Sequence, residues 1–301
     1  MEEISLAHCT LCPHLCSVNR EQGQLGFCRL DAGLHIANIS LHTGEEPIEG
    51  SEKGVCNVFF SHCNLRCCYC QNYQISQPQS VIRNEITDYE TAVNQIVEIL
   101  QSGVKFLGFV SPTSHIPQML RIIEAVHEKG FFPKIIYNTN AYERVETLRV
   151  LEKYVDVYLP DFKYADESLA MRLSGIPNYC KTAVSAIREM YRQKQGVISD
   201  ENPALIIRHL VLPNYIDNSL QVLQRIAEEC STKVFVSLMS QYFPVYNALK
   251  YNLIDRPLKS GEYDVVLKKL DLLGFERGWT QELESNDYYQ PDFSKKNPFE
   301  S

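Results

Sequence analysis

The chain has 301 residues, of which 37 are acidic and 29 basic, so its formal net charge is −8. With 45% hydrophobic and 22% charged residues, its composition excludes a disordered or collagen-like chain. The acidic balance and the scattered basic residues argue against a nucleic-acid partner. No apolar stretch approaches the roughly 18 residues of a membrane helix, and the start does not resemble a secretory signal. We therefore expect a cytoplasmic protein with no nucleic-acid or membrane partner.

The chain divides into three parts by pattern. Residues 1–50 form a cysteine-rich extension with little periodicity, residues 51–275 alternate short apolar runs with amphipathic segments, and residues 276–301 are expected to be an irregular tail packed on the body. Such alternation is the pattern of βα units and predicts an α/β fold with a parallel sheet. The expected strands are Val55–Phe60, Phe106–Val110, Lys134–Tyr137, Val155–Leu159, Ala204–Val211 and Lys233–Leu238. The expected helices are Asp88–Gln101, Ile116–Lys129, Glu143–Lys153, Glu167–Leu173, Lys181–Gln193, Asn218–Glu229 and Glu262–Leu273.

Six βα units fit an incomplete barrel as well as an open doubly wound sheet. In both architectures the chemistry gathers at the carboxyl ends of the strands. The residues directly after each strand are therefore the first candidates for a functional site.

Seven of the eleven cysteines are clustered, which in a reducing compartment indicates metal binding or chemistry rather than disulfides. Cys63, Cys67 and Cys70 follow the first expected strand at spacings that let three thiolates converge. Iron–sulfur clusters usually have four cysteine ligands, so three leave one iron open to a substrate or cofactor. A structural zinc site is the less favoured alternative, because zinc knuckles pair their ligands and add a distant fourth. We expect Cys56, Cys68, Cys180 and Cys230 to be buried as small hydrophobes.

The triplet, with Tyr69 before its last cysteine, resembles the cluster motif of radical S-adenosylmethionine (SAM) enzymes. The resemblance implies that Cys63, Cys67 and Cys70 hold a [4Fe-4S] cluster whose fourth iron binds SAM, with Tyr69 along the adenine. It also implies reductive cleavage of SAM to methionine and a 5′-deoxyadenosyl radical that abstracts hydrogen from a substrate. The fold it implies is an incomplete (β/α)6 TIM-like barrel. His62 stands where relatives commonly carry glycine, a departure that bears on the turn of this loop.

The later strand ends resemble those of pyruvate formate-lyase activating enzyme and its PflX-like, activating-enzyme-related subgroup. The resemblance implies that these strand ends surround SAM, and in some members also a monovalent cation near its carboxylate. Cationic side chains suit the carboxylate of SAM, and oxygen atoms suit hydroxyls or a hard cation. Where many members carry a Gly-Gly-Glu stretch, this chain has no carboxylate, so hydroxyls are the expected acceptors there. The candidate SAM-binding residues are Ser111, Thr113, Asn138, Thr139, Asp161, Lys163 and Arg208.

The amino-terminal group of Cys9, Cys12, Cys16 and Cys28 supplies four thiols. Four thiols suffice for one tetrahedral structural zinc or for an additional iron–sulfur cluster. Spacing constrains the number of ligands better than the identity of the metal, so both readings stay open.

The sequence thus predicts a radical SAM enzyme with an unidentified substrate, for which a glycyl-radical protein is the leading candidate. A protein substrate requires a lateral opening in the barrel that is wide enough for a loop. One alternative is a radical SAM enzyme with an auxiliary cluster that modifies a peptide or small molecule. An alternative of another class is a metal-binding redox sensor or scaffold without catalysis. The enzyme readings imply a reductant such as flavodoxin or ferredoxin.

Overall fold

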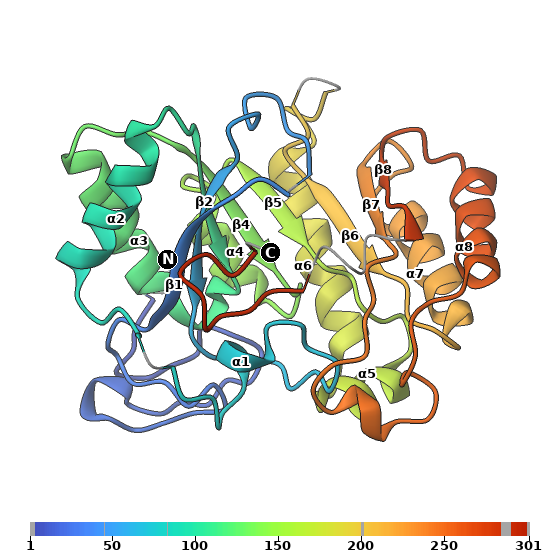
Figure 1. The fold of residues 1–301 in the computed structure, drawn as a ribbon, viewed down its shortest axis with the longest axis horizontal. Helices are drawn as coiled ribbons and strands as arrows, with labels where there is room; N and C mark the ends of the chain where they lie inside the picture. Colours follow the sequence, from blue (N-terminus) through green and yellow to red (C-terminus); the bar gives the residue numbers. More distant parts are fainter. Residues whose placement is uncertain (1–3, 45, 83, 200–201, 284–289, 300–301) are drawn as a thin grey trace.

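Eight strands form the curved sheet at the centre of the computed structural model, which describes residues 4–44, 46–82, 84–199, 202–283 and 290–299 (Figure 1). Strand β1 pairs antiparallel with β2, and all other neighbours are parallel, in the orders β1-β2-β3-β4-β5 and β6-β7-β8. Parallel bridges from Tyr158 to Leu205 and from Asp161 to Arg208 join β5 to β6, so the sheet continues across this junction. The strands are β1 (Ile36–His42), β2 (Val55–Phe60), β3 (Phe106–Val110), β4 (Lys134–Thr139), β5 (Val157–Pro160), β6 (Ile206–Leu210), β7 (Phe235–Met239) and β8 (Gly278–Thr280).

The helices pack on the outer side of this sheet and bury their apolar faces against it (Figure 1). The side chain of Asp88 accepts a hydrogen bond from the backbone N–H of Thr91, which caps the second helix as its sequence predicts. The α-helices are α1 (Tyr73–Ser76), α2 (Tyr89–Gln101), α3 (Ile116–Glu128), α4 (Val145–Leu151), α5 (Glu167–Ser174), α6 (Tyr179–Lys194), α7 (Ile216–Glu229) and α8 (Ser260–Leu272). Short 3₁₀ turns are η1 (Arg20–Gln22), η2 (Pro112–His115) and η3 (Ala248–Lys250).

The six expected strands correspond to β2 through β7, with end points that differ by a few residues. The predicted α/β fold is confirmed, and the parallel course of β2 to β8 agrees with a partial barrel. Two strands were not predicted. Strand β1 lies in the cysteine-rich range and joins the main sheet, whereas β8 lies in the range expected to be irregular and pairs with β7. The division into three domains stays a prediction.

The amino-terminal segment packs against the barrel through the buried side chain of Arg20, which is 1% exposed. Its guanidinium donates to the carbonyl oxygens of Ser114 (2.8 Å) and of Asp31 (2.7 Å). A buried charge is tolerated when it is hydrogen-bonded in this way. Arg20 therefore ties the cysteine-rich segment to the end of β3.

The carboxyl-terminal segment, residues 290–299, crosses the front of the sheet and reaches β1 (Figure 1, dark red). The amide of Asn38 in β1 donates to the carbonyl oxygen of Lys296 at 3.0 Å. The rings of Phe293 and Phe299 lie 5.3 and 5.9 Å from that of Phe59 in β2. This segment therefore walls the side of the barrel at the β1 edge.

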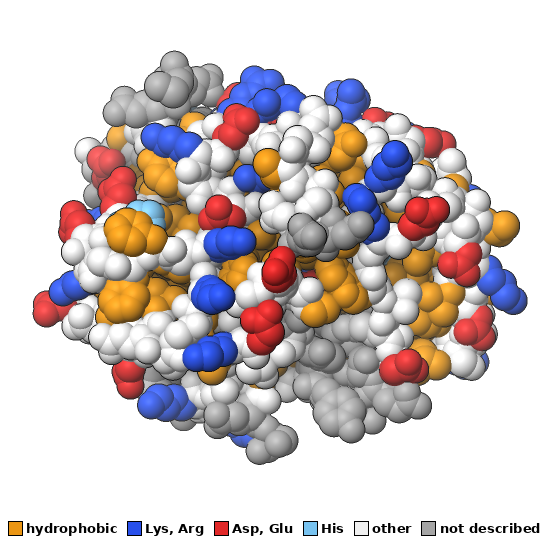
Figure 2. Space-filling model, turned by 90° about the horizontal axis from the view of Figure 1, so that it is seen from above, with side chains coloured by type: hydrophobic (Ala, Val, Ile, Leu, Met, Phe, Trp, Pro, Cys, Tyr) orange, Lys and Arg blue, Asp and Glu red, His pale blue; other side chains and the backbone are white. Residues whose placement is uncertain are grey.

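The two ends of the barrel differ in what lines them. At the amino-terminal end, apolar and charged side chains mix on the surface (Figure 2). A hollow of about 640 Å³ at this end is lined by residues that include Glu49, Lys105, Phe132 and Lys134. This hollow contains none of the predicted site residues. In barrels of this kind the active site lies at the opposite end, where the strands have their carboxyl ends. Among the described residues, no helix is both long and apolar enough to cross a membrane.

Candidate active site

A cavity of about 230 Å³ lies at the carboxyl ends of the strands and collects almost all of the predicted site residues. Its lining includes all three cysteines of the triplet and side chains from the ends of β3, β4, β5 and β6. Parallel strands bring their carboxyl ends to one edge, which explains how residues as far apart in the sequence as Cys63 and Arg208 meet here. The predicted residues in the lining are Cys63, Cys67, Tyr69, Cys70, Ser111, Asn138, Thr139, Asp161, Lys163 and Arg208.

The cluster loop, defined here as residues 61–72, leaves β2 by a left-handed turn at His62, whose φ is 64°. Glycine adopts this conformation most readily, so His62 keeps the turn that glycine makes at the cost of some backbone strain. The backbone N–H of His62 donates to the carbonyl oxygen of Ile75 at 2.7 Å, which closes the loop. The departure from glycine therefore leaves the loop able to turn toward the cavity.

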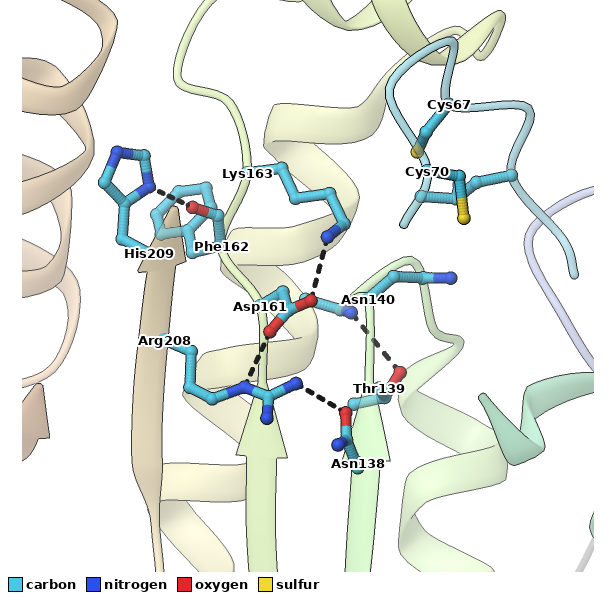
Figure 3. Close-up of polar contacts among 12 residues, drawn as sticks. Cys67, Cys70, Asn138, Thr139, Asn140, Asp161, Phe162, Lys163, Arg208 and His209 are labelled. Atoms are coloured by element: carbon cyan, nitrogen blue, oxygen red, sulfur yellow. Dashed lines mark hydrogen bonds and ion pairs between the residues drawn. The ribbon is translucent and has the colours of Figure 1, made fainter. Parts of the chain in front are cut away.

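The three thiols of the triplet act on one another electrostatically. Burial raises the pKa of Cys63 and of Cys67 to about 11, and the neighbouring thiols Cys67 and Cys70 add to these shifts. Burial also raises the pKa of Cys70, with a contribution from Cys63. The ammonium of Lys163 opposes all three shifts, and it faces the same space as Cys67 and Cys70 (Figure 3). The thiols are thus grouped beside a cation, where binding a metal would displace their protons.

A chain of hydroxyl groups connects two residues of the cluster loop, Cys67 and Tyr69. The thiol of Cys67 lies 3.0 Å from the hydroxyl of Ser174, which lies 2.7 Å from that of Tyr164. The Tyr164 hydroxyl in turn lies 2.6 Å from that of Tyr69. Tyr69 is only 5% exposed, so its ring is held in one place at the wall of the cavity.

Arg208 stands at the centre of a polar cluster made by three neighbouring strand ends (Figure 3). Its Nε donates to one oxygen of Asp161 at 2.7 Å, and its Nη2 donates to the amide oxygen of Asn138 at 2.6 Å. The ammonium of Lys163 donates to the other oxygen of Asp161 at 2.8 Å. Burial alone raises the pKa of Asp161, but Arg208 and Lys163 outweigh burial and hold that pKa below its usual value. Asp161 is therefore ionised and paired with two cations.

Thr113 is the one predicted SAM-binding residue that does not line the cavity among the described residues. It is 1% exposed, and its hydroxyl donates to a carboxylate oxygen of Glu143 at 2.6 Å. The hydroxyls of Thr139 and Tyr137 donate to the same oxygen. Thr113 therefore joins two strand ends, and the end of β3 has a carboxylate nearby that sequence analysis did not expect. Ser111, with a φ of 55°, lies in the lining.

The four amino-terminal cysteines line a common hollow beside the barrel. Burial raises the pKa of Cys12, and the Cys28 and Cys16 thiols contribute to that shift. The backbone N–H of Phe27 donates to the sulfur of Cys16 at 3.3 Å. In the part of the chain that the structure describes, no group of three or more His, Cys, Asp or Glu side chains is arranged so that it could hold a metal ion. The thiols of each set nevertheless share one hollow.

Direct contacts connect the amino-terminal hollow with the cluster loop. The ring of His14 stacks on that of Phe27 at 3.7 Å, and its Nε2 lies 2.9 Å from the carbonyl oxygen of Asn64. The guanidinium of Arg66 lies over the Phe27 ring at 4.1 Å and donates to the Phe27 carbonyl oxygen. The same guanidinium donates to the carbonyl oxygen of Cys63 at 2.7 Å. His14 and Phe27, which flank the amino-terminal thiols, therefore contact the cluster loop at Asn64 and Arg66, and Arg66 in turn holds the backbone of Cys63.

Sequence reasoning missed several residues of the site. Asn140, two residues past the predicted Asn138, donates to the sulfur of Cys63 and to the amide oxygen of Asn64. Its position at a strand end was the available signal. Phe299 also lines the cavity, and no local pattern marks it. His115, at the junction of η2 and α3, is fully buried, and its ring stacks on that of Phe60 at 4.4 Å.

The model of the radical SAM superfamily matches residues 57–230, which is more than half of the sequence. The chain belongs to the radical SAM superfamily. Membership implies a [4Fe-4S] cluster and SAM as cofactors, so the chain is a radical SAM enzyme.

Two relatives show how far the sequence likeness extends. "Uncharacterized protein MJ0674" of Methanocaldococcus jannaschii is 32% identical over 270 residues, which cover 88% of this chain and 74% of that protein. Pyruvate formate-lyase-activating enzyme of Staphylococcus aureus is 27% identical over 175 residues, which cover 54% of this chain and 63% of that enzyme. The likeness to the activating enzyme is thus real but distant.

Solved structures of radical SAM proteins share the fold. Streptococcus suis SuiB bound to its precursor peptide SuiA superposes with a TM-score of 0.50 at 13% identity, over 78% of this chain and 50% of SuiB. HydG, a maturase of the [FeFe]-hydrogenase, superposes with a TM-score of 0.51 at 14% identity, over 74% of this chain and 50% of HydG. The chain spans about half the length of these proteins, and the likeness concerns the fold alone.

Proposed function

We propose that Cys63, Cys67 and Cys70 bind the [4Fe-4S] cluster of this radical SAM enzyme, and that the polar strand ends bind SAM beside it. The observation that supports this assignment is the cavity that both sets of residues line. In it, the three thiols face the hydrogen-bonded polar side chains of Asn138, Asp161, Lys163 and Arg208. The donor chemistry fits both groups, because thiolates ligate iron and cationic side chains pair with carboxylates.

A cluster held by Cys63, Cys67 and Cys70 would supply, from an external reductant, the one electron needed for reductive cleavage of SAM and so for hydrogen abstraction from the substrate. The protein's own residues then have distinct tasks. Lys163 provides a cation for the carboxylate of SAM, and Tyr69 provides a fixed aromatic wall for the adenine. Ser111 offers a hydroxyl at the wall, whereas the hydroxyl of Thr139 is bonded to Glu143. Asn140 and Ser174 hold the sulfurs of Cys63 and Cys67.

A glycyl-radical protein is the leading candidate for the substrate, supported by the likeness to pyruvate formate-lyase-activating enzyme. The carboxyl-terminal segment bears on this choice, because Pro291 and Phe299 belong to the lining of the cavity that a protein loop would have to reach. A peptide or small molecule, modified with the help of an auxiliary cluster, is the second candidate, supported by the four amino-terminal cysteines that line one hollow.

The amino-terminal thiols are proposed to hold either a structural zinc or an auxiliary iron–sulfur cluster. Four cysteines around one hollow fit both. A flavodoxin or ferredoxin is the proposed reductant of the cluster.

SAM cleavage tests the assignment. Anaerobically reconstituted protein is incubated with SAM and dithionite, and 5′-deoxyadenosine and methionine are quantified. We expect both products from the wild type and from Cys68→Ala, because Cys68 is buried outside the cavity lining. Cys63→Ala, Cys67→Ala and Cys70→Ala are expected to form neither. Equal product from Cys67→Ala and Cys68→Ala would refute the ligand assignment.

A further inference from the structure

The oxygens at the ends of β4 and β5 are already occupied by a cation of the chain itself. Arg208 reaches from β6 to the end of β5 and on to β4, where its guanidinium bonds to one oxygen of Asp161 and to the amide oxygen of Asn138 (Figure 3). Lys163 bonds to the second oxygen of Asp161. A backbone bridge between Asp161 and Arg208 fixes their strands in register. Carboxylate and amide oxygens are the donors that a hard cation takes, but here a guanidinium lies on them.

The charges of the described cavity lining balance. Asp161 and Glu46 are the acids, the latter 3.9 Å from Arg208 Nη1, and Lys163 and Arg208 are the bases. Their side chains are only 9 to 19% exposed, so water screens these charges weakly. An added alkali cation would have to share Asp161 with two cations in a poorly solvated place, which like-charge repulsion opposes.

We infer that the Arg208 guanidinium takes the place of a bound monovalent cation between Asp161 and Asn138, so that this SAM site works without an alkali metal ion. The rigid planar fork of arginine spans two oxygens from different strands, as a metal ion would. Arg208 thereby positions Asn138 and Asp161 for SAM. This inference builds on the proposed SAM site, but its first test needs no SAM.

The test compares potassium with tetramethylammonium, which matches its charge but is too large for such a site. Thermal unfolding of the wild type and of Arg208→Ala is followed at constant ionic strength in the two chlorides, without SAM. The wild type is expected to unfold at the same temperature in both salts. Arg208→Ala is expected to unfold at a higher temperature in potassium, or in low guanidinium, than in tetramethylammonium. A potassium-specific stabilisation of the wild type, or no cation response of Arg208→Ala, would overturn the inference.

Arg256→Ala is the matched control. Arg256 also bridges a carboxylate, Glu262, and an asparagine oxygen, that of Asn214, but it lies outside the cavity lining. It is expected to lose stability without a potassium-specific response, and such a response would mark the effect in Arg208→Ala as nonspecific and overturn the inference. If Arg208→Ala does not fold, Arg208→Lys, which keeps the charge, is expected to be indifferent to potassium, and a potassium response in it would also overturn the inference.

SAM affinity, measured by calorimetry on reconstituted protein, separates the inference from the proposed function. The dissociation constant of the wild type for SAM is expected to agree within about twofold in the two salts. Arg208→Ala is expected to bind SAM about tenfold more weakly, because Asp161 and Asn138 lose their charge-assisted hydrogen bonds to Arg208. Absence of SAM binding in every buffer would count against the proposed SAM site and leave the thermal result to decide the role of Arg208. A wild-type affinity that rises with potassium would contradict the inference.

Discussion

At the scale of single residues, Glu143 is the group whose chemistry departs most from its sequence appearance. It is 2% exposed and accepts hydrogen bonds from Thr113, Thr139 and Tyr137 on one oxygen. In the described part of the chain, its Oε2 has no hydrogen-bond partner. Burial raises the pKa of Glu143 to about 7. Glu143 thus binds the ends of β3 and β4 together, and its proton content changes near neutral pH.

Glu143→Gln is expected to change how stability depends on pH. The folded protein keeps the Glu143 proton up to about pH 7, whereas the unfolded chain releases it near the usual value of 4.5. The raised pKa therefore stabilises the fold at pH values below 4.5, and this contribution is lost as the pH rises toward 7. Glutamine mimics the protonated form at every pH, so the variant should gain on the order of 2 kcal/mol over the wild type by pH 8.

Chemical denaturation of both proteins at pH 5 and pH 8 measures this effect. The difference in free energy of unfolding should be small at pH 5 and should favour the glutamine variant at pH 8. A difference that is the same at both pH values would show that Glu143 has an ordinary pKa.

The residues of the candidate site were accessible to sequence reasoning to unequal degrees. Asp161, Lys163 and Arg208 stand directly at strand ends, where the parallel sheet brings side chains together. Glu143 lies four residues past the end of β4, where the sequence predicts only the start of a helix. The sequence predicts that Thr113 binds SAM, because nothing in it distinguishes a strand-end hydroxyl that lines a cavity from one that bonds to a buried carboxylate.

At the scale of elements, the cluster loop depends on the segment that carries the amino-terminal thiols. Arg66 connects the two, because one guanidinium reaches the carbonyl oxygens of both Cys63 and Phe27. His14 adds a second connection through Asn64. The position of a predicted cluster ligand is thus set partly by a segment outside the barrel.

Arg66→Ala is expected to release iron from the reconstituted cluster about tenfold faster than the wild type, because it removes hydrogen bonds from a charged donor worth about 1.5 kcal/mol. Iron release to a chelator under anaerobic conditions measures the rate. Arg144→Ala is the matched control, since Arg144 bonds to the Thr10 carbonyl oxygen of the same segment at 2.7 Å and pairs with Glu146 outside the cluster loop. Equal release rates in the two variants would show that docking of the segment, and not Arg66 itself, matters.

Prediction of the elements succeeded where the physical signal is local. Strands β2 and β3 are buried along their whole length, and apart from Asn57 and Gly108 their residues are apolar. Strand β1 gave no such signal, because its burial does not alternate and its register shifts between Ile36 and Asn38. Strand β8 has three residues, too few for any periodicity.

At the scale of the whole molecule, the barrel, the cysteine-rich segment and the carboxyl-terminal segment converge on one cavity. Alternating strands and helices predict a parallel α/β fold, and only the resemblance of the cysteine triplet and strand ends to radical SAM enzymes implies a barrel rather than an open sheet. The course of residues 290–299 could not, because contacts such as that of the Lys296 carbonyl oxygen with Asn38 use backbone atoms that every residue carries. The segment restricts access from the β1 side, so the fold itself bears on which substrates enter.

The most direct test of the proposed cluster and SAM sites is electron paramagnetic resonance of the dithionite-reduced, anaerobically reconstituted protein before and after addition of SAM. We expect a [4Fe-4S] signal that shifts with SAM in the wild type and in Cys68→Ala. No SAM-responsive signal is expected in Cys63→Ala, Cys67→Ala or Cys70→Ala. A signal from an amino-terminal cluster, if that site holds one, would remain in all variants and would not respond to SAM. An intact wild-type cluster whose signal is unchanged by SAM would contradict the assignment of the cavity as the radical SAM site.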